Sequence, residues 1–396
     1  MLSALILAVV VVVGGLLIWP RLANAAVWRA TITPLASIIG SGFLVLGPIL
    51  DVSFGGYAPL VMLALCAVAY LFGGAIRYNI AQIADTASMP PVVHQLERIA
   101  SAVLAFAFFV SVAYYLNLFG AFGVSLTDLD DSFHANLLTT AVFMLILVVG
   151  WTRGFMALER MEQFSVGLKL AIIAGLLFGL AIYFGQSAQS DALQFHAPHV
   201  TGWTAITLMA GLMVTVQGFE TSRYLGASYD AALRIRSMKL AQWVSTIIYV
   251  IYIVLLTYAF DFDAQLLDET AIIDLIRVVA PILPLLLVVA ALSAQFSAAI
   301  ADTSGSGGLI TEVSKGKVSE RLAYALLVGF GILITWTANV FEIISYASRA
   351  FATYYAIQAC IAALTAKKRG ETWKAALFTA MSLIGAAIAL FGAPVE

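Results

Sequence analysis

A membrane-length apolar stretch near the start of the chain contains residues that interrupt a helix. It runs from Ile38 through Gly40, Ser41 and Gly42 to Pro48. Each Gly costs a helix about 1 kcal/mol relative to Ala, and Pro lacks the backbone N–H that the helix needs. Backbone groups freed at membrane depth must be buried in protein or line a cavity that holds something polar. We therefore predict unwinding near Gly40 to Gly42 and a binding site there.

The composition is that of an integral membrane protein. Of 396 residues, 62% are hydrophobic and 11% are charged, whereas soluble domains carry about 25% charged residues. The lipid bilayer is therefore an expected partner, and the net charge of −2 gives no reason to expect nucleic acid. A spanning helix needs about 20 apolar residues. Candidate segments are residues 2–19, 28–50, 57–76, 99–124, 135–151, 163–184, 203–222, 241–260, 281–302, 322–340, 342–366 and 373–392.

The positions of Lys and Arg predict the orientation of these segments. Cytoplasmic loops are enriched in both residues. When loops are assigned alternately to the two sides, all but three of the 20 Lys and Arg fall on one side, the exceptions being Lys169, Arg277 and Arg349. The pattern predicts a multi-pass protein of the plasma (inner) membrane with both termini non-cytoplasmic. Residues 1–19 lack the basic start of a secretory signal, so we expect a retained helix.

The order of the segments indicates an internal repeat. Residues 1–27 form an extra N-terminal helix with its linker, and residues 367–396 an extra C-terminal helix. The ten segments between them divide into residues 28–184 and 185–366, and five helices each place the two halves in opposite orientations. A second interruption is then expected at the start of the second half, where Val214 to Glu220 contains β-branched residues, a Gly and a Glu. Paired breaks of this kind indicate a substrate site.

These segments resemble those of a known transporter superfamily. Ile38 to Pro48 is similar to the first-helix signature of the amino acid/polyamine/organocation (APC) superfamily, and Gly218-Phe219-Glu220 to its sixth-helix pattern. Lys169 resembles the fifth-helix Lys of proton-linked and exchanger members. The resemblance implies an all-α LeuT-type fold of 5+5 inverted repeats, here of about 12 helices. It also implies transport of an amino acid or related amine by alternating access.

The chain departs from the superfamily pattern at two places. Val214 stands where many members have an aromatic residue, and the Gly-rich segment 301–308, expected at the end of the eighth core helix, replaces a basic residue and an aromatic. These departures leave the substrate and the gating open.

The substrate site is expected where the two breaks meet. N–H groups at the start of a helix attract an anion, and freed carbonyls at Ile38 and near Val214 suit an ammonium. By resemblance, Ser41 and Gly42 would bind a substrate carboxylate. The alternative is that the glycines only permit close helix packing. The candidates are Ile38, Gly40, Ser41, Gly42, Val214, Gln217, Gly218 and Glu220.

Four ionisable residues lie within the spans: Lys169, Glu220, Asp302 and Arg349. Such residues are functional candidates by default. Lys169 lies about 21 Å into its segment, where its ammonium could carry a proton or replace a sodium ion; the alternative is a fixed ion pair with Asp302 or Glu220. Glu220 is expected to cap or hydrogen-bond the break, with substrate-amine binding or titration as alternatives.

The other two residues are expected nearer the membrane surfaces. Asp302 is expected near the cytoplasmic end of its helix, with a solvated, capping or transport role. Arg349 is expected to form an outer gate or to contact an anionic substrate. Sodium coupling is the competing hypothesis, because hydroxyls of one helix could bind the ion; packing is the alternative for these hydroxyls, which belong to Ser293, Ser297, Thr303 and Ser304.

The predicted function is that of a secondary active transporter for an amino acid or related amine, proton-linked or exchange-type. No nucleophile motif, metal-ligand cluster or paired carboxylate supports an enzyme, a metal site or a cofactor, and H⁺ is the candidate coupling ion. The alternatives are a sodium-coupled symporter of another small solute and a transporter-like solute sensor. Substrate identity, transport direction and oligomeric state are not determined by the sequence.

Overall fold

The computed structural model describes residues 1–40, 42–82, 91–152, 155–224, 229–260 and 270–394. Every regular element in these ranges is a helix. They are α1 (Leu2–Leu17), α2 (Pro20–Ala23), α3 (Ala26–Ile38), α4 (Gly42–Phe54), η1 (Gly55–Tyr57), α5 (Ala58–Gln82), α6 (Pro91–Val124), α7 (Ser132–Thr152), α8 (Phe155–Gln189), α9 (Gly202–Gly211), η3 (Met213–Val216), α10 (Thr221–Tyr224), α11 (Ala231–Thr257), α12 (Ala271–Ile276), α13 (Leu283–Val313), α14 (Glu320–Thr335), α15 (Val340–Lys368) and α16 (Thr372–Phe391).

The predicted all-α membrane architecture is confirmed. Each predicted segment coincides with one helix or with a run of shorter helices, and seven helical stretches in the described ranges are long and apolar enough to cross a membrane. Several helices begin earlier than predicted: α6 at Pro91 and α11 at Ala231. Hydropathy marks only the apolar part of a helix, and these helices continue into polar sequence. The division into repeats stays a prediction, and α8 continues to Gln189, past the proposed boundary at 184.

The prediction that the eighth core helix ends in the Gly-rich segment is wrong. Helix α13 continues through this segment to Val313. A Cβ atom at Gly307 would lie 2.5 Å from the Tyr324 ring, and one at Gly305 would lie 3.0 Å from the Phe108 ring. The glycines therefore allow α6 and α14 to approach α13 closely, as small residues do between membrane helices.

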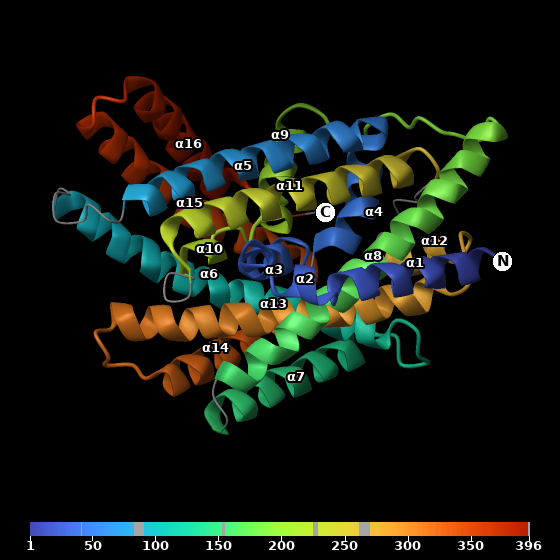
Figure 1. Ribbon diagram of the computed structural model, residues 1–396, viewed down its shortest axis with the longest axis horizontal. Helices are drawn as coiled ribbons and strands as arrows, with labels where there is room; N and C mark the ends of the chain where they lie inside the picture. The colour runs from blue at the N-terminus through green and yellow to red at the C-terminus, as the bar shows by residue number, and fades with distance from the viewer. Residues whose placement is uncertain (41, 83–90, 153–154, 225–228, 261–269, 395–396) are drawn as a thin grey trace.

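The first helix is shorter than predicted. Helix α1 has 16 residues, about 24 Å at 1.5 Å per residue, which is less than the roughly 30 Å of a hydrocarbon core. It packs along α8, with Ile6 fully buried between them. Figure 1 shows that α2, which carries Arg21, lies near the middle of the long axis of the molecule. Helix α2 is thus not at an end of the molecule, although the loop assignment placed this segment on the cytoplasmic side.

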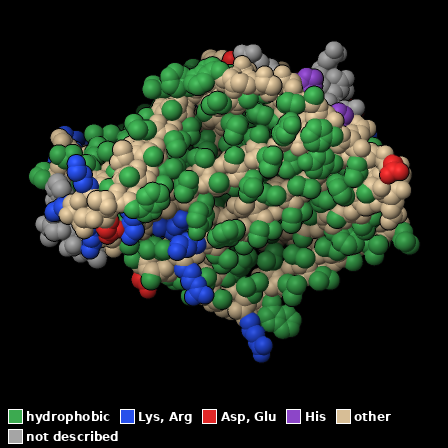
Figure 2. Space-filling view, turned by 90° about the horizontal axis from the view of Figure 1, so that it is seen from above, with side chains coloured by type: hydrophobic (Ala, Val, Ile, Leu, Met, Phe, Trp, Pro, Cys, Tyr) green, Lys and Arg blue, Asp and Glu red, His purple; other side chains and the backbone are tan. Residues whose placement is uncertain are grey.

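Helix α6 packs along both α13 and α15. The long helices run roughly along the long axis and are tilted against each other (Figure 1). The surface in Figure 2 is mostly hydrophobic, and its Lys and Arg side chains gather mainly toward one end of this axis. In Figure 1 that end carries the α15–α16 turn and the start of α6.

Candidate substrate and coupling site

The first helix break lies between α3 and α4. Helix α3 ends at Ile38 and α4 begins at Gly42, which confirms the predicted interruption; Ser41 lies outside the described residues. Pro48 is not at the break but inside α4. Its missing N–H would have bonded the carbonyl of Leu44, and the Tyr252 hydroxyl of α11 donates to that carbonyl instead, over 3.2 Å. The Pro is therefore accommodated without a second break.

The second break lies between α9 and α10, also as predicted. The chain passes from α9 through η3 into Gln217, which is extended, with φ −81° and ψ 175°. Gly218 follows with φ +117°. A Cβ atom at Gly218 would lie 2.6 Å from the backbone nitrogen of Ile38. The two breaks are thus in direct contact, and only glycine fits at this position.

One tyrosine of α11 is within hydrogen-bond distance of a carbonyl at each break. The Tyr249 hydroxyl lies 2.9 Å from the carbonyl oxygen of Ile38 and 2.8 Å from that of Thr215, so its proton is available to both acceptors. These are the carbonyls at Ile38 and near Val214 that we expected from the sequence to suit a substrate ammonium. Ser348 of α15 has a similar role, because its hydroxyl accepts from the Val214 N–H over 2.9 Å and donates to the Gly211 carbonyl.

Buried side chains hold the second break to α6 and α15. Glu220 is fully buried, and its Oε2 accepts from the Gly218 N–H over 3.0 Å and from the Tyr355 hydroxyl over 2.8 Å. The Gln217 amide donates to the Tyr115 hydroxyl over 2.8 Å. Glu220 therefore makes the hydrogen bonds at the break that the sequence favoured. The remaining oxygens, Glu220 Oε1 and Gln217 Oε1, are buried with no hydrogen-bond partner among the described residues.

Gly42 lies against the second break. A Cβ atom there would lie 2.6 Å from Cβ and 2.8 Å from Cα of Thr215. Close packing between the breaks thus accounts for a glycine at this position, which was the alternative to substrate binding. Val214, like Thr215, is buried in η3. A substrate carboxylate at Ser41 and Gly42 stays a prediction.

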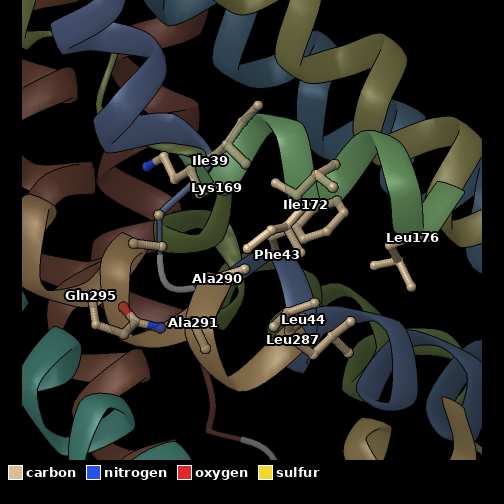
Figure 3. Close-up of a pocket in the computed structure, with 13 residues that line it drawn as sticks. Ile39, Phe43, Leu44, Lys169, Ile172, Leu176, Leu287, Ala290, Ala291 and Gln295 are labelled. Atoms are coloured by element: carbon tan, nitrogen blue, oxygen red, sulfur yellow. The ribbon is translucent and has the colours of Figure 1, made fainter. Parts of the chain in front are cut away.

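Lys169 of α8 contacts the last turn of α3, beside the first break. The side chain is fully buried, and Nζ donates to the carbonyl of Ala36 over 2.6 Å. In Figure 3 its nitrogen points toward α3 and away from Phe43, Ile172 and Leu176. The pocket drawn there has a volume of about 20 Å³, which is room for about one water molecule. It is therefore too small to be the substrate site.

Comparison with known proteins identifies the family of this chain. A family model for APC superfamily transporters matches residues 20–392. The chain belongs to the APC superfamily. A protein of Aquifex aeolicus (strain VF5), an uncharacterized protein by its name, is 40% identical over 388 residues, which are 95% of this chain and 93% of the relative.

The fold of this APC transporter is also similar to a solved structure. That structure is Mhp1, a nucleobase-cation-symport-1 family transporter, in a closed conformation with bromovinylhydantoin bound. The two chains are 12% identical, with a TM-score of 0.58, over 92% of this chain and 91% of Mhp1. The likeness confirms the LeuT-type fold.

In this APC transporter Asp302 is not near a solvated helix end. It is 1% exposed and lies well inside α13. The Ser111 hydroxyl of α6 donates to its Oδ2. This bond places Asp302 at the contact between α13 and α6. The expectation of a solvated or capping Asp302 is wrong, because it relied on the helix ending at 302.

The hydroxyls considered for sodium bond within their own helix. Ser297, Thr303 and Ser304 donate to α13 carbonyls three or four residues earlier, over 3.0, 2.7 and 2.9 Å, while Ser293 is half-buried on the same helix. These contacts correspond to the packing alternative. No group of three or more His, Cys, Asp or Glu in the described ranges is placed to hold a metal ion.

Arg349 lies next to Ser348, which bonds the second break. It is half-buried on α15, and its Nε donates to the carbonyl of Gly392 over 2.9 Å. It contacts the segment that follows α16, which hydropathy could not indicate.

Sequence reasoning missed Tyr249, Ser348 and Tyr355 at the two breaks, Tyr252 at Leu44 and Ser111 at Asp302. Tyrosine and serine are common in membrane helices, so the only usable signal was the need of each break for hydrogen-bond donors.

Proposed function

We propose that this APC transporter moves an amino acid or related amine across the membrane by alternating access. The proposal is supported by the contact between the two broken helices and by their buried, unpaired acceptors. Glu220 Oε1 and Gln217 Oε1 have no hydrogen-bond partner among the described residues, and buried acceptors are costly unless a donor reaches them. The N–H groups of an amine are such donors. A solute that binds here when the site opens would satisfy both.

We further propose that Lys169 replaces a coupling cation. The single observation that carries this is the 2.6 Å bond from its ammonium to the Ala36 carbonyl at the first break. A buried ammonium supplies positive charge to the first-helix carbonyls, and a sodium ion beside it would be repelled. Transport should then be proton-linked, if Lys169 releases its proton during the cycle, or exchange-type, if its charge is permanent.

The substrate class is tested by thermal unfolding of the purified protein with a panel of amino acids, amines, nucleobases and hydantoins. We expect an amino acid or an amine to raise the melting temperature through its binding energy. The hydantoin is included because bromovinylhydantoin is the ligand in the Mhp1 structure. Stabilisation by nucleobases or hydantoins alone would contradict the amine assignment.

The coupling is tested with the stabilising solute in reconstituted vesicles. We expect uptake or exchange to be equal in sodium and potassium buffers. Lys169→Ala should still bind the solute but move it at least tenfold more slowly, whereas Lys239→Ala, which changes an exposed lysine of α11, should behave as the wild type. Strict sodium dependence would contradict the role of Lys169. Binding with neither uptake nor exchange would favour a solute sensor.

A further inference from the structure

Arg349 is a cation within a membrane helix that the transport site does not use. It makes no ion pair with any described residue, and the one hydrogen bond that its side chain makes in the described part of the chain is the Nε contact to Gly392. The guanidinium has five N–H donors, so its two Nη groups are available. Ionisable residues inside the membrane are expensive and normally have a partner. A partner for the Nη groups of Arg349 is therefore expected from outside the described residues.

A groove of about 630 Å³ lies beside this guanidinium, between α6, α14 and α15. Its walls are mostly apolar, and Phe106 and Phe330 meet in it with ring centroids 5.8 Å apart. Phe106 is 53% exposed and Tyr346 is 45% exposed, so the groove opens on the outside of the helix bundle. In a membrane protein this surface faces acyl chains rather than water.

We infer that this groove binds an anionic phospholipid, with an acyl chain along Phe106 and Phe330 and the phosphate on Arg349. An apolar groove with one cation is complementary to an amphiphile with one anionic group. The planar guanidinium fits phosphate oxygens with two parallel hydrogen bonds. Arg349 lies about 14 Å along α15 from its start, and its long side chain combines an apolar stem with a charged head.

The bound lipid would act on the second helix break through α15. Ser348, next to Arg349 in the chain, bonds both the Gly211 carbonyl and the Val214 N–H. A lipid that orders this turn of α15 would also stabilise that break. The inference does not depend on which solute is transported.

The test uses the purified full chain in a neutral detergent. Dioleoyl phosphatidylglycerol, dioleoyl phosphatidylcholine and free oleate are titrated, with bound lipid counted by native mass spectrometry. We expect phosphatidylglycerol to bind about tenfold more tightly than phosphatidylcholine, because the choline ammonium of phosphatidylcholine neutralises its own phosphate. Arg349→Gln should abolish this preference, whereas Arg236→Gln, which removes an exposed arginine of α11, should keep it.

Three results would overturn the inference: equal binding of the two phospholipids by the wild type, an unchanged preference in Arg349→Gln, or tighter binding of oleate than of phosphatidylglycerol. Arg349→Gln also loses the bond to Gly392 and could fold poorly. Ala350→Phe fills the groove and leaves the arginine in place, since Ala350 lines it as well. We expect this variant to bind phosphatidylglycerol at least threefold more weakly, and unchanged binding by folded Ala350→Phe would contradict the assignment.

Discussion

Tyrosine hydroxyls replace backbone hydrogen bonds that the broken and Pro-containing helices lack. The Tyr249 hydroxyl is shared by the carbonyls of Ile38 and Thr215. The Tyr252 hydroxyl donates to the carbonyl of Leu44, which has no helical donor because Pro48 lacks an N–H. Both tyrosines are fully buried, and a tyrosine supplies a large apolar body together with one polar hydrogen. At residue scale, the backbone groups at and near the breaks are thus hydrogen-bonded by side chains from distant helices.

Removing the Tyr249 hydroxyl should therefore be costly. We expect Tyr249→Phe to lower the free energy of unfolding by about 1–3 kcal/mol, because it leaves buried carbonyls without a donor. The measurement is the thermal unfolding of detergent-solubilised protein. Tyr57→Phe is the control, since Tyr57 is 50% exposed and should change stability little. Equal melting temperatures for the two variants would contradict the role of Tyr249.

The glycine at the second break should be irreplaceable. Gly218→Ala places a Cβ atom 2.6 Å from the Ile38 backbone and forces a side chain onto φ +117°. We expect a loss of at least about 1–3 kcal/mol of stability, together with loss of transport. Gly308→Ala is the matched control, because a Cβ atom there meets nothing within 4 Å and Ala favours the α13 helix. A stable, active Gly218→Ala variant would disprove the tight contact between the breaks.

At the scale of elements, the short helix α10 depends on its neighbours. Arg223 of α10 pairs with Glu97 of α6 over 2.5 Å and with the Gln358 side chain of α15 over 2.8 Å. Asn79 of α5 also donates to Gln358, over 2.8 Å. Four residues cannot form a stable helix alone. This polar network therefore ties the inner half of the second broken helix to three longer helices.

Breaking the ion pair should loosen α10. The two side chains are only 10% and 30% exposed, so we expect Glu97→Gln to speed hydrogen exchange in residues 221–224 while α7 stays protected. The charge-swapped pair, Glu97→Arg with Arg223→Glu, should recover part of the protection, with a coupling of about 0.5–3 kcal/mol in the double-mutant cycle. Additive effects of the two single charge changes would show that the pair contributes nothing.

At the scale of the whole molecule, charge is distributed unevenly between the two ends. Lys and Arg gather mainly at the end with the α15–α16 turn (Figure 2). Loops enriched in these residues stay in the cytoplasm. We therefore expect this end to face the cytoplasm and the turn after α6 to face outward.

Cysteine labelling tests this orientation. In a background with Cys66→Ser and Cys360→Ser, Asp130→Cys should react with an impermeant thiol reagent in intact cells, and Lys317→Cys only after permeabilisation. Both positions are exposed, so access to the reagent depends on the side of the membrane. Labelling in the reverse order would overturn the orientation and the assignment of the termini.

The apolar spans and the two breaks could be located from the sequence alone, whereas the ends of several helices, which continue into polar or Gly-rich sequence, could not. Spans require a local run of apolar residues, and breaks follow from local backbone chemistry at Gly40 to Gly42 and at Gly218. Both signals lie within about 20 residues of chain. The fold class follows from the number and order of the spans together with the family motifs.

The partners of the freed backbone groups were decided only by the tertiary structure. The Tyr249 hydroxyl donates to the carbonyl of Ile38, 211 residues away in the sequence, and the Lys169 ammonium donates to that of Ala36, 133 residues away. No local sequence pattern predicts contacts between residues so far apart in the chain, because the association of membrane helices depends on packing and hydrogen bonding rather than on hydropathy. The same reason applies to Asp302, which is buried because α13 continues as a closely packed helix past its glycines. It also applies to Arg349, which bonds the segment after α16.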